Sequence, residues 1–350
     1  MTSAPQLAVP PKVRAGDRVA VLSPSWAAPG VFPDVHEKGM RVLREDLGLV
    51  PVEFPTTRLV GATPEARAAD LMAAFADPSI RAVLASIGGQ DQITVLPHLD
   101  SSVFVGDPKP FLGYSDNTNL LNWLWNLGIV GYYGGSTMVH LARAGGLHPV
   151  SLASLRNALF NHDTVEILPV EDFSDMDPDW SDLSTLVAPT PTTRDPGWRW
   201  HNTNQVVTGP TWGGNLEILH WNLAVGRWIR PVTEYAGCVL LLETSEEMPS
   251  AVEVYRMLRN AGERGLLAQF PAIVVGKPKA WNGENPRTES ERATFRSDQY
   301  EAVLRAVGEY NPGAVVVCGP DFGHTDPQYV LPYGGQMTVD GIRRRILVSY

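Results

Sequence analysis

The sequence predicts an α/β protein, with a doubly wound parallel sheet in its N-terminal half and a smaller mixed α/β domain in its C-terminal half. In the first half, short apolar runs alternate with longer amphipathic stretches, which is typical of βαβ units. The runs are apolar almost throughout, as expected when helices cover both faces of a sheet. A length of 350 residues, of which 44% are hydrophobic, suits two domains with cores of their own.

The first half contains the clearest alternation of strands and helices. Strands are expected at Val19–Leu22, Ala82–Ile87, Pro110–Tyr114 and Ile129–Tyr133. Helices are expected at His36–Leu47, Glu65–Phe75 and Asn117–Leu127. The second helix has clear boundaries, because Thr63 is a good N-cap, Pro64 suits the first helical position and Pro78 ends the helix.

From about residue 163 the pattern changes. Residues 171–200 are rich in Asp, Pro, Thr and Ser without clear periodicity, which indicates an inter-domain connection or a long surface loop. Such a segment is either functional or a solvated linker. We place an N-terminal domain at residues 1–165, the connection at 166–205 and a C-terminal domain at 206–350. In the last, strands are expected at 238–242, 272–275, 314–318, 337–339 and 346–348, and helices at 251–260 and 297–307.

Composition narrows the class of protein. Lys and Arg number 28 against 38 Asp and Glu, which argues against nucleic acid as a partner because phosphate binding requires clustered cations. The two cysteines, Cys238 and Cys318, exclude a disulfide framework and a multi-cysteine metal site. The histidines show no metal-binding spacing, so neither a metal nor another cofactor is expected. Residues 1–11 lack a signal-peptide core and no apolar stretch approaches about 18 residues, so we expect a cytoplasmic enzyme that acts on a small molecule, away from membranes.

The most informative segment places Ser115 between an apolar strand and an amphipathic helix. Gly113-Tyr-Ser-Asp-Asn117 is close to the Gly-x-Ser-x-Gly nucleophile elbow, with Asn in place of the last Gly. An elbow of this kind exposes the serine hydroxyl at the carboxyl end of the sheet, beside the positive end of a helix. The alternative is that Ser115, Asp116 or Thr118 only caps the helix.

Further polar or glycine positions follow other predicted strands. Gly88 and Gly89 would let a backbone N–H approach a ligand closely. Glu243 ends an apolar run, where its burial would require a partner, although it could also begin the next helix. His324 lies in a Gly- and Pro-rich loop, where a lone histidine is usually structural. Together, Ser115, Glu243 and His324 are the set that a serine hydrolase needs: nucleophile, orienting carboxylate and general base.

Five short segments carry a more specific signal. They are Ser86–Asp91, Gly113–Thr118, Gly213–Leu216, Leu241–Glu247 and Phe322–Thr325. In sequence and order they resemble the LD-carboxypeptidase family of serine peptidases, and in particular its microcin C immunity, or MccF-like, branch. The resemblance extends from residue 13 to the C-terminus.

The resemblance implies a flavodoxin-like N-terminal domain, a smaller C-terminal α/β domain and a homodimer. It also implies that Ser115, Glu243 and His324 form a catalytic triad, with the backbone N–H groups of Gly89 and Asp116 as the oxyanion hole. The implied reaction is hydrolysis of the amide that joins an aminoacyl or peptidyl group to a nucleotide, as in microcin C-type toxins. Release of the terminal D-alanine from a murein tetrapeptide is the alternative, and a binding protein of the same fold without turnover is a second one.

Candidate residues for substrate binding have weaker signals. Trp198, Trp200 and Trp212 flank the end of the connection and could either stack on a purine or pack at the domain boundary. Asn215 is a candidate polar contact to the substrate. The polar loop at residues 281–291 could border the pocket, and no role is assigned to it.

Overall fold

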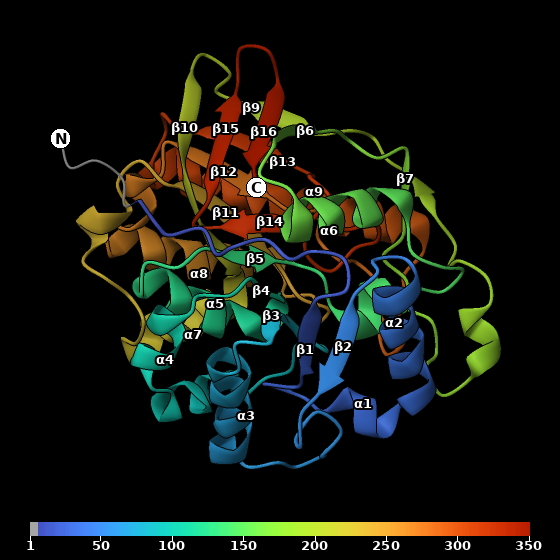
Figure 1. Ribbon diagram of the computed structural model, residues 1–350. Helices are drawn as coiled ribbons and strands as arrows, with labels where there is room; N and C mark the ends of the chain where they lie inside the picture. Colours follow the sequence, from blue (N-terminus) through green and yellow to red (C-terminus); the bar gives the residue numbers. More distant parts are fainter. Residues whose placement is uncertain (1–5) are drawn as a thin grey trace.

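The computed structural model describes residues 6–350 and contains two large β-sheets, which occupy the lower and upper halves of Figure 1. The blue and cyan N-terminal segments form most of the lower half, and the orange and red C-terminal segments form most of the upper half. The predicted α/β class is therefore confirmed. Residues 1–5, which belong to the predicted N-terminal domain and to the stretch without a signal-peptide core, lie outside the described range.

The first sheet has the strand order β14-β5-β4-β3-β1-β2. Its strands are β1 (Arg18–Leu22), β2 (Val50–Glu53), β3 (Ile80–Ala85), β4 (Phe111–Gly113), β5 (Gly131–Tyr133) and β14 (Leu331–Tyr333). The first five run parallel in the order 2-1-3-4-5, which is the flavodoxin-like order. β14 pairs antiparallel with β5, so the C-terminal part of the chain completes this sheet.

Helices follow the strands of the first sheet. They are α1 (Ala28–Val31), α2 (Pro33–Glu45), α3 (Pro64–Ala76), α4 (Ser101–Gly106), α5 (Thr118–Asn126) and α6 (Pro149–Phe160). Helices α1 to α5 connect strands of this sheet, and α6 leads from β5 to β6 (Thr164–Ile167) of the second sheet. The predicted start of α3 is confirmed, because the Thr63 hydroxyl accepts the N–H of Ala66 at 3.3 Å. The sequence did not predict β2 or α6. β2 contains Pro51, which an edge strand tolerates because one side of its backbone needs no ladder hydrogen bond.

The second sheet is mixed, with the order β6-β16-β15-β10-β11-β12-β13-β9. β10, β11, β12 and β13 run parallel, and antiparallel strands flank them on both sides. The strands are β6 (Thr164–Ile167), β9 (Arg199–His201), β10 (Val206–Asn215), β11 (Val239–Glu243), β12 (Ala272–Val275), β13 (Val315–Cys318), β15 (Gln336–Asp340) and β16 (Arg345–Ser349). Because β6 and β9 also join this sheet, it draws on residues before 206, and the exact domain boundaries stay a prediction.

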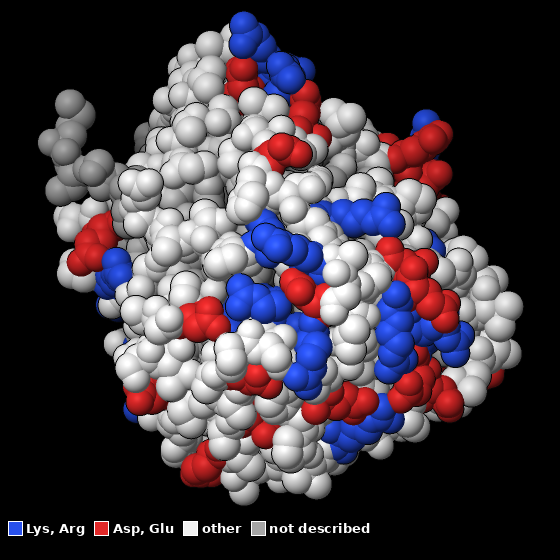
Figure 2. All heavy atoms as spheres, in the orientation of Figure 1, with Lys and Arg blue, Asp and Glu red and all other residues white. Residues whose placement is uncertain are grey.

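Three helices accompany the second sheet: α7 (Leu216–Val225), α8 (Ala251–Glu263) and α9 (Glu289–Tyr310). α9 begins eight residues before the predicted start at 297. The Thr288 hydroxyl accepts the backbone N–H of Glu291, and the Glu291 carboxylate accepts the backbone N–H of Thr288, which is a capping box. In the described residues no helix combines the length and apolarity that a bilayer crossing requires. On the face in Figure 2, Lys and Arg are interspersed with Asp and Glu.

The inter-domain segment, residues 171–200, is held against the second half of the chain by ion pairs, most of which are buried. It contains a small hairpin of β7 (Asp172–Phe173) and β8 (Thr193–Arg194). The pairs join Asp175 to Arg292 and Arg296 at 2.6 and 2.7 Å, Asp177 to Lys279 at 2.7 Å, and Asp195 to Lys277. Acidic side chains of the segment thus meet basic side chains of α9 and of residues 277–279, so the segment is no solvated linker.

Lys277 is the most enclosed of these cations, and we expect Lys277→Met to lower the free energy of unfolding by about 3–5 kcal/mol. Its ammonium lies 2.5 Å from Asp321 and also pairs with Asp195, and the three side chains are at most 3% exposed. The substitution leaves two buried carboxylates without their cation. Denaturant unfolding followed by circular dichroism measures the loss. Arg194→Met, which breaks an exposed pair with Glu171, is the control and should leave the midpoint nearly unchanged.

Candidate active site

Ser115 occupies a sharp turn between β4 and α5. Its φ angle is +60°, in the left-handed region that non-glycine residues rarely adopt. Its backbone N–H donates to the Tyr133 hydroxyl at 3.3 Å, and a short 3₁₀ turn over Ser115–Asn117 leads into α5. This is the strand–turn–helix context predicted for a nucleophile elbow, and backbone strain is a usual feature of such turns.

Of the two glycines after β3, Gly88 packs directly against this turn and Gly89 packs against Ser25 and Trp26. A Cβ atom on Gly88 would lie 2.9 Å from the Ser115 Cβ and 3.0 Å from its hydroxyl oxygen. A Cβ atom on Gly89 would lie 2.1 Å from the Ser25 hydroxyl oxygen, so neither position has room for a side chain. Because β3 and β4 are parallel neighbours, their carboxyl ends bring the glycine loop and Ser115 together.

Asp116 and Gln92 fix the relative position of the two loops. The buried Asp116 carboxylate accepts the Ser25 hydroxyl and the backbone N–H of Gln92, the latter at 2.9 Å. Burial raises the pKa of this carboxyl group. The Gln92 side chain is also buried, and it donates to Asn117 at 2.7 Å and accepts the N–H of Leu120 at 3.0 Å. Sequence reasoning missed Gln92, since nothing in a lone glutamine signals such a link.

Glu243, the last residue of β11, meets His324, which lies in the loop after β13. The His324 Nδ1 atom lies 2.6 Å from Glu243 Oε2, and both side chains are buried. The other carboxylate oxygen accepts the Tyr133 hydroxyl at 2.5 Å and the Asn215 amide at 3.1 Å. Asn215, predicted as a substrate contact, is itself buried behind Glu243, where it also caps α7. The structure therefore brings two of the three predicted triad residues into direct contact.

The second ring nitrogen of His324 faces another carboxylate. Its Nε2 atom lies 3.1 Å from Glu246 Oε2, and the Glu246 side chain is 57% exposed. Burial lowers the pKa of His324, but Glu243 and Glu246 raise it more, to about 10. Partial desolvation at the cavity wall raises the pKa of Glu246, but the nearby His324 lowers it more, to about 2. Sequence reasoning missed Glu246, although it lies in the segment Leu241–Glu247.

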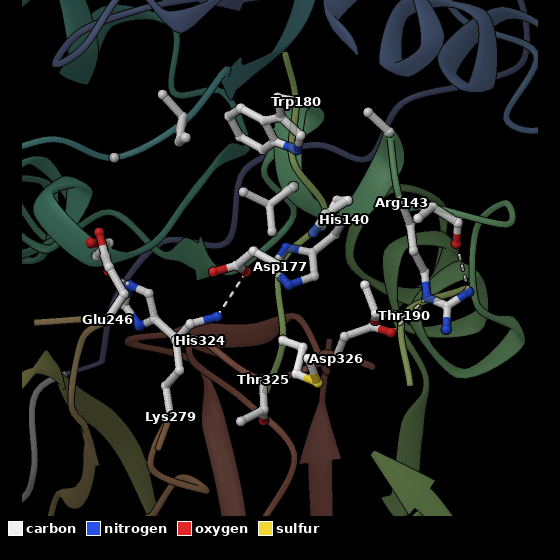
Figure 3. A pocket seen from close by; sticks show the side chains of 18 of the residues that line it. His140, Arg143, Asp177, Trp180, Thr190, Glu246, Lys279, His324, Thr325 and Asp326 are labelled. Atoms are coloured by element: carbon white, nitrogen blue, oxygen red, sulfur yellow. Dashed lines mark hydrogen bonds and ion pairs between the residues drawn. The ribbon is translucent and has the colours of Figure 1, made fainter. Parts of the chain in front are cut away.

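A cavity of about 410 Å³ opens in front of these groups, and Ser115, His324 and Glu246 all line it. Figure 3 shows His324 and Glu246 at one end, with the Lys279–Asp177 pair beside them and the Arg143–Asp326 pair farther along. The inter-domain segment contributes a wall of the cavity, formed by Ser174, Met176, Asp177, Pro178, Asp179, Trp180 and Thr190. The long loop predicted there therefore borders the candidate site.

The aromatic side chains of the cavity differ from those predicted. Trp26 and Trp180 line it together with Phe32, whose ring makes edge contacts with both at 6.3 and 5.5 Å. Of the predicted tryptophans, Trp212 is buried in another cluster, stacked on Phe270.

The other predicted binding elements also lie outside this lining. Trp198 and Trp200 contact each other in and beside β9. The loop at residues 281–291 reaches the site only indirectly, because the Asn282 amide donates to the backbone carbonyl of Glu246 at 2.9 Å. Within residues 6–350, no group of three or more His, Cys, Asp or Glu side chains is arranged to hold a metal ion.

Comparison with known families identifies the chain. A model of the LD-carboxypeptidase N-terminal domain matches residues 19–134, and a model of the LD-carboxypeptidase C-terminal domain matches residues 208–339. The chain belongs to the LD-carboxypeptidase family. The family consists of serine peptidases, so the predicted resemblance is confirmed at this level.

Relatives of this LD-carboxypeptidase family member include the microcin C7 self-immunity protein MccF of Escherichia coli, 24% identical over 99% of this chain and 96% of that protein. A proposed carboxypeptidase of Vibrio cholerae is 25% identical over 93% of this chain and 92% of that protein. Among solved structures, an MccF-like protein from Streptococcus pneumoniae in complex with AMP has a TM-score of 0.84 and 27% identity, over 96% of this chain and 99% of that one. The predicted triad, oxyanion hole, homodimer and cytoplasmic location stay predictions.

The two carboxylates on His324 make stability depend on pH. The folded-state pKa of His324 is about 10, above its ordinary value of 6.5, so its contribution is complete below pH 6.5 and is lost as the pH rises toward 10. We expect the difference in free energy of unfolding between the wild type and His324→Gln to shrink over this interval. Denaturant titrations at several pH values measure it, and a difference that stays constant would contradict the assigned charge state.

Proposed function

We propose that this chain hydrolyses the amide bond between an aminoacyl or peptidyl group and a nucleotide-like moiety, with Ser115 as nucleophile, His324 as general base and Glu243 as the orienting carboxylate. One observation carries the proposal: a serine on a strained strand–helix turn and a histidine bonded to a buried carboxylate line the same cavity. Nucleophile, base and carboxylate at strand ends are what acyl transfer by a serine enzyme requires.

In the proposed mechanism, the Ser115 hydroxyl attacks the amide carbonyl carbon while His324 Nε2 takes its proton. Glu243, 2.6 Å from Nδ1, holds the ring in the required tautomer and stabilises the imidazolium. The backbone N–H groups of Gly89 and Asp116 would bind the oxyanion, each worth roughly 3–4 kcal/mol in the transition state. His324 then protonates the leaving amine, and water hydrolyses the acyl-enzyme by the reverse proton path.

The cavity wall supports a nucleotide-like leaving group. Trp26 and Trp180 expose aromatic surface to the cavity, and base–aromatic stacking is the usual way to bind a nucleobase without sequence readout. The similar Streptococcus pneumoniae protein binds AMP, and MccF has been crystallised with glutamyl sulfamoyl guanosine and aspartyl sulfamoyl adenosine. Cleavage of a murein tetrapeptide, which the family name favours, is the second candidate, and a peptide end makes less use of this aromatic wall.

Product analysis separates the two candidates. We expect the purified protein to convert an aminoacyl sulfamoyl adenosine into free amino acid and sulfamoyl adenosine, as read by mass spectrometry. Ser115→Ala should abolish this reaction yet still bind the substrate, since the hydroxyl contributes to bond making rather than to affinity. A murein tetrapeptide ending in D-alanine is offered in parallel. Release of D-alanine alone would assign the chain to cell-wall peptides, and full turnover by Ser115→Ala would refute the nucleophile.

The aromatic wall gives a binding test. In the Ser115→Ala background, Trp180→Ala should weaken binding of the aminoacyl sulfamoyl adenosine by about 1–3 kcal/mol, because one face of the nucleobase loses its stacking partner. Isothermal titration calorimetry measures the change in Kd. Trp221→Ala serves as the matched control, because Trp221 is 41% exposed and lies outside the cavity lining. An equal Kd for all three proteins would place the nucleobase elsewhere.

A further inference from the structure

His324 has a carboxylate against each of its ring nitrogens. Glu243 occupies Nδ1 at 2.6 Å, and Glu246 occupies Nε2 at 3.1 Å. A ring held in this way carries protons on both nitrogens. Nε2 is the atom that must accept the Ser115 proton, so His324 in this arrangement cannot act as a base. Something in the catalytic cycle has to remove Glu246 from Nε2.

The charges around the cavity indicate what does so. Its lining contains four carboxylates, on Asp177, Asp179, Glu246 and Asp326, and two permanent cations, on Arg143 and Lys279. Arg143 is already paired with Asp326 at 2.6 Å, and Lys279 with Asp177 at 2.7 Å. Among the described residues, His324 is the only ion-pair partner of Glu246. Lys279 is close enough to Glu246 to lower its pKa, but its ammonium is already paired with Asp177. Neither permanent cation of the lining is therefore free to pair with Glu246.

The neighbours of His324 do not supply that cation. The ring of Tyr114 packs against His324 with centroids 4.9 Å apart and brings no charge. His140 also packs against Tyr114, with ring centroids 5.3 Å apart, and burial lowers its pKa to about 3, so its ring is neutral. A positive group at Glu246 must therefore come with the substrate.

The Glu246 side chain can exchange partners without any movement of its backbone. The turn that carries it is anchored from both sides: Glu217 accepts the N–H and hydroxyl of Ser245 at 2.9 and 2.7 Å, and Asn282 donates to the Glu246 carbonyl at 2.9 Å. The carboxylate itself extends into the cavity and is more than half exposed. A rotation of its side chain is enough to move it from His324 to a bound ligand.

We propose that Glu246 is a specificity residue, which accepts the α-ammonium group of an aminoacyl substrate and thereby frees His324 Nε2 to activate Ser115. This inference rests on the proposed function and narrows it to aminoacyl substrates with a free α-amine, because the corresponding nitrogen of a peptidyl group is an uncharged amide. In an aminoacyl substrate the ammonium nitrogen is two bonds from the carbonyl carbon that Ser115 attacks, so it reaches the neighbourhood of Nε2. When the ammonium replaces the imidazolium as partner of Glu246, the ring releases its Nε2 proton to solvent and becomes neutral. An N-acylated substrate lacks the cation and leaves the His324–Glu246 pair in place.

A matched pair of substrates tests the exchange. The wild type is offered an aminoacyl sulfamoyl adenosine with a free α-amine and the same compound with an N-acetyl group. We expect kcat/KM to favour the free amine by about tenfold or more, the size of one charge-assisted hydrogen bond. In Glu246→Gln this preference should fall to within about threefold of unity, because a neutral amide no longer distinguishes the two substrates. Glu247→Gln removes the adjacent exposed charge and should keep the wild-type preference.

A second measurement tests, without a nucleotide substrate, whether Glu246 restrains His324. It uses the rate at which Ser115 is labelled. A neutral fluorophosphonate labels an activated serine, and Ser115→Ala is the blank. We expect the wild type and Glu247→Gln to label slowly, and Glu246→Gln to label about tenfold faster because one carboxylate no longer holds the Nε2 proton. Equal labelling rates in the three proteins, or an unchanged amine preference in Glu246→Gln, would overturn the inference. If labelling proceeds as expected but neither aminoacyl sulfamoyl adenosine is hydrolysed, the proposed substrate and the ammonium exchange are refuted. The contact of Glu246 with His324 Nε2 would then still be shown to slow the activation of Ser115.

Discussion

The Tyr133 hydroxyl is the contact on which the candidate site depends. It lies at the end of β5 in the first sheet and receives the backbone N–H of Ser115 at 3.3 Å. It also donates to Glu243, at the end of β11 in the second sheet, at 2.5 Å. One oxygen thus connects the turn that carries the proposed nucleophile with the carboxylate that holds the proposed base. Burial raises the pKa of Tyr133 well above its ordinary value, so the phenol remains a hydrogen-bond donor.

This contact requires the two sheets to be built together. Glu243 is almost fully buried, and a carboxylate in such a place is tolerated only when its oxygens are hydrogen-bonded. Its partners come from both halves of the chain: Tyr133 from the first sheet, and Asn215 and His324 from the second. β14 adds a further connection between the two halves of the chain. It belongs to the C-terminal part, yet it pairs with β5 of the first sheet, the strand that carries Tyr133. Neither half could present the complete site alone.

Much of this arrangement could be predicted from the sequence, because parallel strands leave a clear local signal. Ser115, Glu243 and His324 each follow an apolar run, and side chains at the carboxyl ends of such runs gather at one edge of a sheet. The predicted order of elements was right for the same reason, and errors fell where that signal is weak. β2 was not predicted because Pro51 interrupts its strand pattern. The start of α9 was predicted too late because its first turns are polar, although Thr288 and Glu291 have the spacing of a capping box.

Contacts across the fold could not be predicted in this way. Trp26 and Trp180 are about 150 residues apart in sequence, and only the tertiary structure shows that they share a wall with Phe32. The tryptophans predicted from the sequence pack elsewhere: Trp198 contacts Trp200, and Trp212 stacks on Phe270. Gln92 and Tyr133 likewise act through partners that no local pattern specifies. Asn215 illustrates the opposite error. It was predicted to contact the substrate, but it is buried and donates to Glu243 instead.

The charge state of the site follows from these same geometric constraints. A histidine bonded to one buried carboxylate is already a stronger base than a free imidazole, and a second carboxylate at its other nitrogen stabilises the protonated ring further. Glu243 is held by three partners from two sheets, whereas Glu246 lies on the cavity side and, among the described residues, its carboxylate forms an ion pair with His324 alone. Glu243 therefore sets the orientation of the His324 ring, and Glu246 determines whether Nε2 of that ring can accept a proton. Because Arg143 and Lys279 of the cavity are already paired, the charge of the bound substrate determines whether Glu246 stays paired with His324.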